Sequence, residues 1–255
     1  MPILSIVKSI VLQGLDGILI NVETDISSGM PCWDVVGLPD TNIKESKERV
    51  RTAIKNCGIE LLSRKYIINL SPASVRKTGA SLDLAIAVGI LSSMKIIKKE
   101  YMNNIVFIGE LSLDGSLNKI NGILPICIEA KKHGIEEIIL PKENAKEAAI
   151  VRGLKVIGIS NLKEVINYLN GKKNVPEQLI NMDELLKSNT KNIVDFSEVK
   201  GQRCAKRALE VAAAGGHNCL LIGSPRIWEN NDGKKITYHI TRLKFWRIIG
   251  NYKNT

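Results

Sequence analysis

YIINLSPASVRKTGASLDLAIAVGIL, residues 66–91, joins a short apolar run to a longer one through a loop rich in Gly and Ser. The first run, residues 66–70, consists mainly of Tyr, Ile and Leu and predicts a buried strand. The second run, from Ser81, is too long for a strand and is rich in Ala and Leu, so it predicts a buried helix. A buried strand followed by a buried helix indicates an α/β domain.

The residues before position 66 predict three strands and a surface helix. Residues 6–11 and 18–25 alternate apolar and polar side chains, as in a β-hairpin, and residues 31–36 predict a third strand. A helix follows, from a cap at Asp40 or Thr41 to about residue 56. Its charged side chains are interpreted as a solvated face rather than a binding patch: Lys44, Glu45, Lys47, Glu48, Arg49 and Arg51.

The pattern after position 91 alternates strands and helices. Strands are expected at residues 105–113, 137–140 and 155–159, and helices at 125–132, after 141 and at 161–169. These elements predict a mixed α+β domain over residues 1–170. Residues 171–194 are polar and contain Pro176, so we expect a linker there, with a short helix at 182–187.

Residues 195–225, DFSEVKGQRCAKRALEVAAAGGHNCLLIGSP, resemble the start of a nucleotide-binding domain. The apolar run at 219–222 predicts a buried strand, and Gly223, Ser224 and Pro225 predict a phosphate-binding turn after it. A P-loop needs Gly, Lys and Ser or Thr next, because the lysine reaches the phosphates and the hydroxyl binds magnesium. Instead, residues 226–255 have a different character, with seven Lys/Arg against two Asp/Glu.

The genetic code offers an explanation for this change after Pro225. In a frame read one base later, each new codon combines the last two bases of one codon with the first base of the next. Trp228 and Glu229 then give glycine, Glu229 and Asn230 give lysine or arginine, and Asn230 and Asn231 give threonine or isoleucine. With allowed codons the shifted frame reads GSPGFGKT, a complete P-loop. Our hypothesis is that one extra base near the Pro225 codon shifted the frame, so that residues 226–255 form an aberrant tail. The alternative is a natural, unrelated C-terminal extension.

Composition fits a globular chain and adds little about partners. The net charge is +10, of which the tail supplies +5, so the charge that would indicate nucleic-acid binding is discounted. Five cysteines are scattered without a C-x-x-C pair, so we expect small core or half-buried residues rather than a disulfide framework or zinc site. Without a signal sequence or membrane span, we expect a cytoplasmic protein.

Four segments in order resemble the magnesium-chelatase-like AAA+ ATPases of bacteria, the ComM/YifB competence-protein family. They are VGLPDTNIKESKERVRTAIKNCGIE, INLSPASVRKTGASLDLAIAVGIL, FIGELSLDGSLNKINGILP and DFSEVKGQRCAKRALEVAAAGGHN. The resemblance covers residues 1–225. It implies a Lon-protease-like fold for residues 1–170 and the start of an AAA+ ATPase module at 195–225.

The resemblance also implies cofactors and partners for a complete member: ATP and Mg²⁺, a homo-hexamer, and DNA in branch migration during natural transformation. Because the expected lysine, magnesium-binding acids and arginine finger would lie after Pro225, we expect this chain to have no functional cofactor and no ATP hydrolysis. We expect it to be a monomer or to associate weakly, with no membrane contact and no catalytic residues.

A Lon-type peptidase would need a serine activated by a lysine. By the resemblance Ser81 occupies the serine position, but Leu124 occupies the lysine position and cannot accept a proton. Lys119 would need a different backbone path to replace it. Ser81 is therefore interpreted as a residue at a helix start. The remaining functional alternative is a stand-alone Lon-like module that docks on sister subunits or on DNA.

The other candidate residues have structural interpretations. His133 is expected to lie at a helix end, and His217 to support the turn before the phosphate loop, whereas His239 lies in the tail. Asp83 is expected to cap the buried helix rather than act as an acid or base. The sequence contains no carboxylate pair or His/Cys cluster that predicts a metal site.

Overall fold

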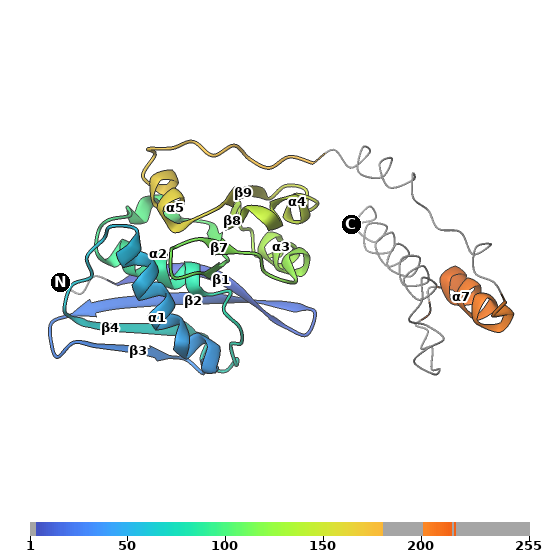
Figure 1. Ribbon diagram of the computed structural model, residues 1–255, viewed down its shortest axis with the longest axis horizontal. Coiled ribbons are helices and arrows are strands. Elements are labelled where there is room, and N and C mark those ends of the chain that lie inside the picture. The colour runs from blue at the N-terminus through green and yellow to red at the C-terminus, as the bar shows by residue number, and fades with distance from the viewer. Residues whose placement is uncertain (1–3, 181–200, 216, 218–255) are drawn as a thin grey trace. The chain divides into compact units, whose positions relative to one another are not determined.

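The computed structural model describes residues 4–180, 201–215 and 217 of the 255-residue chain, which divides into two compact units after Met182 (Figure 1). Each unit is considered by itself. The strands are β1 Ser5–Gln13, β2 Asp16–Ser27, β3 Cys32–Val36, β4 Lys65–Ser71, β5 Ile105–Phe107, β6 Glu110–Leu111, β7 Leu117–Asn118, β8 Glu137–Pro141 and β9 Lys155–Ile159. The helices are α1 Thr41–Asn56, α2 Asp83–Ser93, α3 Ile123–Lys132, α4 Ala145–Ala148, α5 Leu162–Leu169 and α7 Arg203–Gly215, with 3-10 turns η1 Lys99–Met102 and η2 Lys142–Asn144.

A seven-stranded sheet in the order β3-β4-β2-β1-β5-β8-β9 organises the first unit. Only β2 runs against its neighbours, since it pairs antiparallel with β1 and β4 while every other neighbouring pair is parallel. The carboxyl ends of six strands therefore lie at one edge. Connections leave this edge after β3, β4 and β5, and they contain three of the motifs that carry the family resemblance.

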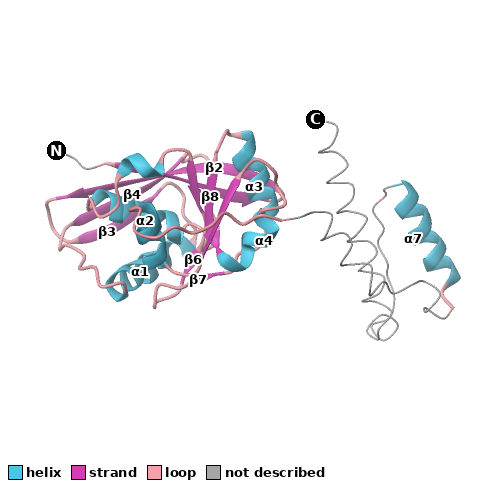
Figure 2. Cartoon of the chain, turned by 90° about the horizontal axis from the view of Figure 1, so that it is seen from above, coloured by secondary structure: helices cyan, strands magenta, loops and turns pink. Residues whose placement is uncertain are grey.

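Helices cover the sheet on two sides and enclose two apolar cores (Figures 1 and 2). The first core contains side chains of α1, α2 and α5, and the second contains side chains of α3 and α4. Successive side chains of a strand point to opposite faces of the sheet. In β8, Ile139 accordingly belongs to the first core and Ile138 to the second. On β2 and β4 the face away from the first core carries polar residues such as Glu23 and Asn69, which are hydrogen-bonded at 3.0 Å.

The two long helices of the first unit follow from their sequences. Asp40 is the N-cap of α1, and its carboxylate accepts a hydrogen bond from the Ile43 amide at 2.9 Å. Every residue of α2 is buried, so this helix lies inside the domain and needs no polar face. Gly89 allows α2 to lie close to the sheet, since a Cβ there would be 2.6 Å from the Thr24 hydroxyl.

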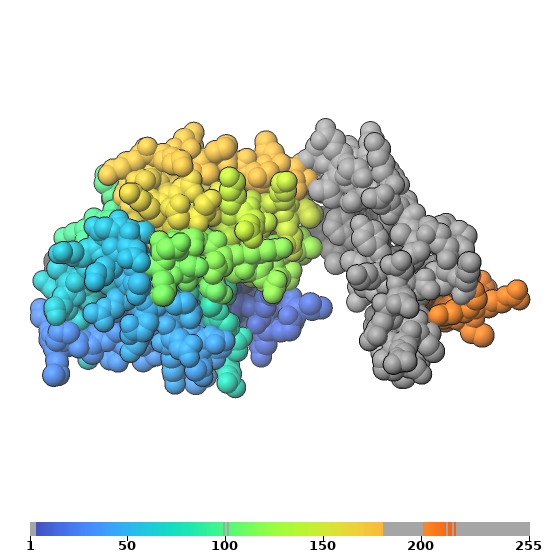
Figure 3. All heavy atoms as spheres, in the orientation of Figure 1, coloured from blue at the N-terminus to red at the C-terminus, as the bar shows by residue number. Residues whose placement is uncertain are grey.

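The strands and helices expected within residues 1–170 are confirmed, with small shifts in their bounds. The largest difference is at residues 105–113, where the expected strand is divided into β5 and the β6–β7 hairpin. This hairpin rests on α1, where the Asn56 amide donates to the Leu113 carbonyl at 2.7 Å. In Figure 3 the green surface of residues 110–118 adjoins the blue surface of α1.

The ordered backbone of the first unit continues past the expected boundary at residue 170. Gly171 and Lys172 donate backbone hydrogen bonds into the end of α5, and Val175 packs against the first core. The linker thus begins as part of the domain. The short helix expected at 182–187 lies outside the described residues.

In the second unit the structure describes α7 and His217. The amide of His217 donates to the Ala212 carbonyl at 2.8 Å. A role of its side chain in the turn stays a prediction. Cys204 on α7 is exposed, so the expectation that the cysteines are core or half-buried residues is wrong there, whereas Cys32, Cys57 and Cys127 fit it. Cys219 and His239 lie outside the described residues. None of the described helices is long and apolar enough to cross a membrane.

Candidate functional site

The loops after β3 and β4 form one hydrogen-bonded cluster at the carboxyl edge of the sheet. The Asp40 amide donates to the Lys77 carbonyl at 3.0 Å, and the Lys77 amide donates to the Leu38 carbonyl at 3.2 Å. While one carboxylate oxygen of Asp40 caps α1, the other accepts from the Gly79 amide at 3.0 Å. The cap residue therefore fixes two loops that are far apart in the sequence.

Lys77 is the most unusual residue of this cluster, because its side chain is fully buried. Its ammonium donates to the Gly37 carbonyl at 2.8 Å and to the Pro72 carbonyl. Burial lowers the pKa of Lys77, because removal from water disfavours the charged ammonium. Gly37 has φ +97°, and a Cβ there would collide with the Leu70 carbonyl, so only glycine fits beside the ammonium.

A buried ion pair lies next to this cluster and joins α1 to α2. Arg49 donates to both carboxylate oxygens of Asp83, at 2.8 and 3.1 Å, and the Leu111 amide adds a bond at 3.3 Å. Asp83 is fully buried, which raises its pKa to about 6, although the bonds from Arg49 act in the opposite direction. Asp83 thus connects three elements: α1, α2 and β6.

This pair corrects two expectations from the sequence. Asp83 does not cap α2, because the N-cap is Leu82 and no side chain bonds the first turn of the helix. Arg49 is not part of a solvated face, because it is bound to a carboxylate that has no access to solvent. Both side chains are used for tertiary contacts between distant parts of the chain.

The described residues do not assemble a serine–lysine pair at the peptidase position. Ser81 lies in the turn before α2, where its carbonyl accepts from the Gly109 amide at 2.9 Å. Leu124 lies in the first turn of α3 and packs against the second core. Lys119 is exposed. The amide and carbonyl of the next residue, Ile120, are both hydrogen-bonded to the buried Asn144 side chain, and these bonds fix the backbone beside Lys119.

The other candidate residues behave as structural groups. His133 is the C-cap of α3, and its Nε2 atom lies 3.2 Å from Glu129. Within the described ranges, no three His, Cys, Asp or Glu side chains gather to hold a metal ion. Gly223, Ser224 and Pro225, predicted to form the remnant of the phosphate turn, lie outside the described residues.

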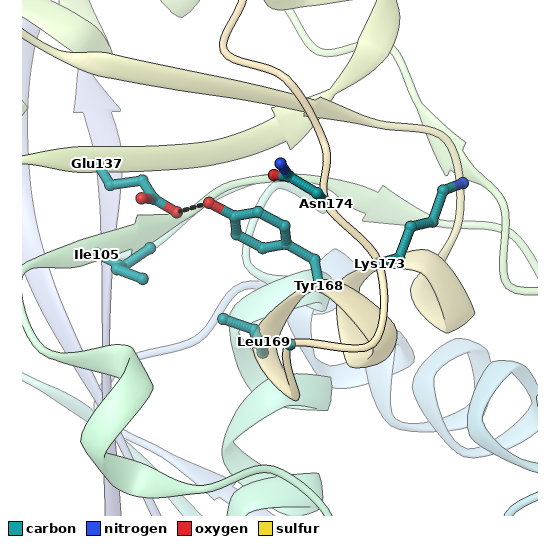
Figure 4. Close-up of a pocket in the computed structure, with 7 residues that line it drawn as sticks. Ile105, Glu137, Tyr168, Leu169, Lys173 and Asn174 are labelled. Atoms are coloured by element: carbon teal, nitrogen blue, oxygen red, sulfur yellow. Dashed lines mark hydrogen bonds between the residues drawn. The ribbon is translucent and has the colours of Figure 1, made fainter.

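A second polar group, which the sequence did not indicate, lies at the amino ends of β8 and β9, opposite the carboxyl ends of these strands. Tyr168 donates to Glu137 at 2.9 Å (Figure 4). Lys155 donates to Glu137 at 2.6 Å and to the Tyr168 hydroxyl at 3.1 Å. These bonds raise the pKa of Lys155, and burial raises that of Tyr168. A cavity of about 420 Å³ opens beside Glu137 and Tyr168.

Two protein-family models and several known proteins match this chain. The model of subunit ChlI of Mg-chelatase matches residues 22–144, and a second model, for the magnesium chelatase subunit ChlI, matches residues 195–236. Competence protein ComM of Haemophilus influenzae is 35% identical over 223 residues. The chain belongs to the ComM/YifB family of magnesium-chelatase-like proteins.

Other relatives support the same assignment and the fold. YifB of Escherichia coli, described as uncharacterized, is 38% identical over 224 residues. Each of these alignments covers 87% of this chain but only 44% of ComM and 43% of YifB, so the chain spans less than half of these relatives. Lon protease 2 of Bacillus subtilis is 30% identical over 129 residues, 49% of this chain and 22% of that protein. The α/β domain with its mostly parallel sheet is therefore Lon-like.

Proposed function

We propose that this ComM/YifB-family chain is a non-proteolytic Lon-like domain joined to the beginning of an AAA+ motor that acts on DNA, and that the chain itself does not hydrolyse ATP. The strongest support is the order of its parts: a Lon-like domain that lacks the peptidase lysine at Leu124, followed by a segment that matches a magnesium chelatase model. The name of ComM, a competence protein, supports natural transformation as the process.

The absence of ATP hydrolysis follows from the residues after Gly223. In the P-loop spacing, the positions for glycine, lysine and threonine hold Trp228, Glu229 and Asn230. A carboxylate at the lysine position repels the phosphates instead of binding them. The chelatase match extends to residue 236, past Pro225, without restoring the lysine at its required spacing.

Sequencing the gene from the Gly215 codon onward tests the frameshift hypothesis. If one base is in excess near the Pro225 codon and its removal gives the reading GSPGFGKT, the restored protein should hydrolyse ATP in the presence of Mg²⁺ while the 255-residue chain does not. Replacing the restored lysine by alanine is the matched control. ATP hydrolysis by the 255-residue chain would refute the proposed inactivity.

The restored protein tests the proposed partners as well. We expect it to form a hexamer with ATP and to move branch points in DNA, whereas the 255-residue chain should remain a monomer or associate weakly. Analytical ultracentrifugation and a branch-migration assay measure the two properties. A restored protein that hydrolyses ATP but ignores branched DNA would remove the DNA role and leave the ATPase assignment intact.

A second function, a docking module, is supported by the completeness of the Lon-like domain. Both apolar cores are formed by residues before position 183, and the buried charges form contacts within the domain. Salt-sensitive gel-shift of the 255-residue chain with single-stranded or branched DNA would support DNA docking. For the peptidase alternative, we expect no casein cleavage, and activity lost in Ser81→Ala would overturn the interpretation of Leu124.

A further inference from the structure

Residues 174–180 leave α5 and run along the outer side of β9, the last strand of the sheet (Figure 1). The Gln178 amide donates to the Val156 carbonyl of β9 at 2.9 Å. Val175 packs against the first core at the start of this segment. One backbone hydrogen bond thus joins the segment to the outer edge of β9, although the segment is not itself a strand.

The outer edge of β9 is open to such a neighbour. Backbone groups of a strand point alternately to its two sides, and Lys155 uses its amide toward the β8 side, where it bonds the Glu136 carbonyl at 2.9 Å. Val156 and Gly158 therefore point outward. An uncovered strand edge is a site for pairing with another extended chain, and this chain supplies one of its own.

The attachment of this segment is weak. Among the described residues, the bond from Gln178 is the one hydrogen bond between residues 174–180 and the rest of the domain. Leu179 is 75% exposed. The ion pair of Lys173 with Glu164, just before the segment, has a lysine that is 56% exposed and contributes little.

A cavity lies beside residues 171–174, the root from which the segment leaves the domain. Its volume is about 420 Å³, and it separates Gly171, Lys173 and Asn174 from Ile105, Glu137 and Tyr168 of the domain body (Figure 4). Side chains do not fill this space, so the root gains less packing energy than a buried strand does. Val175 and Gln178 are the described contacts of the segment with the domain, and Ile180 is half-buried.

We propose that residues 174–180 form a detachable edge strap, which covers β9 when bound and lengthens the connection to the following residues when released. Detachment of the strap would release about 20 Å of extended chain while leaving the two cores intact. The strap would thus control the reach between the Lon-like domain and whatever follows residue 180. This inference does not depend on ATP hydrolysis or DNA binding by the chain.

Two proline variants of the 255-residue chain isolate the strap's hydrogen bond. Gln178→Pro removes the bonded amide, whereas Leu179→Pro changes a neighbouring residue whose amide points away from β9 by the alternation of the strand. Trypsin needs an extended chain on both sides of the bond after Lys173, so we expect cleavage there to be faster when the strap, which begins at Asn174, leaves the domain. Both substitutions lie beyond the residues that the protease contacts most closely.

We expect cleavage after Lys173 to be about fivefold faster in Gln178→Pro than in Leu179→Pro, as the loss of one hydrogen bond predicts. Val175→Ser should also accelerate cleavage, because it removes the apolar anchor. Synthetic peptides with each substitution correct for intrinsic cleavage rates, and thermal melting verifies folding. Equal rates in the two proline variants would overturn the proposal.

Amide hydrogen exchange in the unmodified chain gives a second measurement that requires no variant. The Gln178 amide should be protected, and the Leu179 amide should exchange at the rate of an unfolded peptide. Protection of Gln178 should be lost at low denaturant, before the amides of β8 exchange, because strap release is local. An unprotected Gln178, or one that exchanges only with the whole domain, would contradict a detachable strap.

Discussion

Replacing Arg49 by methionine should destabilise the Lon-like domain in a manner that depends on pH. The variant leaves Asp83 buried with the Leu111 amide as its remaining partner. Removing one partner of a buried ion pair costs about 3–5 kcal/mol at neutral pH. Asp83 avoids part of this cost by taking up a proton, because its neutral form tolerates burial better.

The pH dependence can be estimated from the pKa of Asp83, which is about 6 in the intact domain. If Asp83 stays neutral in the variant, each pH unit above 6 adds about 1.4 kcal/mol to the difference between variant and parent. The destabilisation should therefore be about 2 kcal/mol larger at pH 7.5 than at pH 5. Urea denaturation at the two pH values measures both quantities.

Two controls separate this effect from a general loss of packing. Arg51→Met changes an exposed arginine of the same helix and should cost less than about 1 kcal/mol at either pH. Arg49→Met combined with Asp83→Asn removes the buried charge and should abolish the additional loss at high pH. A cost for Arg49→Met below about 1 kcal/mol at pH 7.5, or one that does not change with pH, would refute the reasoning.

Three further predictions concern the same edge of the sheet. In the parent chain, Asp83 has a folded pKa of about 6 against an ordinary 3.8, so the folded state binds its proton more tightly. Its contribution to the free energy of unfolding should therefore fall by about 2.4 kcal/mol as pH rises from 4 to 7, and Asp83→Asn should flatten this slope in denaturation measured across that range. Lys77→Met leaves two carbonyls without a donor and should cost about 2 kcal/mol by urea denaturation, whereas the exposed Lys44→Met should be neutral; equal costs would contradict the role of the buried ammonium. Gly37→Ala should lower stability by about 3 kcal/mol or more, but Gly14→Ala, at positive φ with open space around it, by about 1–2 kcal/mol; thermal melting that ranks them in the other order would rule out the close contact at Gly37.

Most strands and helices of the Lon-like domain were predictable, because their signals are local. Alternation of apolar residues marked the β1–β2 hairpin, and the helical cap at Asp40 was identified from residue type and spacing. The division of residues 105–113 was missed, since nothing local distinguishes a continuous strand from one that leaves the sheet after Phe107.

The site was less predictable, because its contacts join distant residues. A carboxylate at the start of a mostly apolar helix, such as Asp83, requires a buried partner, and Arg49 lies between the inward-facing Ser46 and Val50 of α1. This combination was a usable signal. Lys77 gave none, because lysine in a loop is ordinarily exposed and its acceptors here are backbone carbonyls.

The sequence by itself determined the order of strands and helices, the lack of a lysine at Leu124, and the interruption of the P-loop spacing at Trp228 and Glu229. These features depend on residue type and on short spacings along the chain. Only the tertiary structure decided which charges are buried, which loops they join, and that residues 174–180 lie on the edge of β9. Burial and pairing depend on where distant segments meet, and that is set by packing of the whole domain.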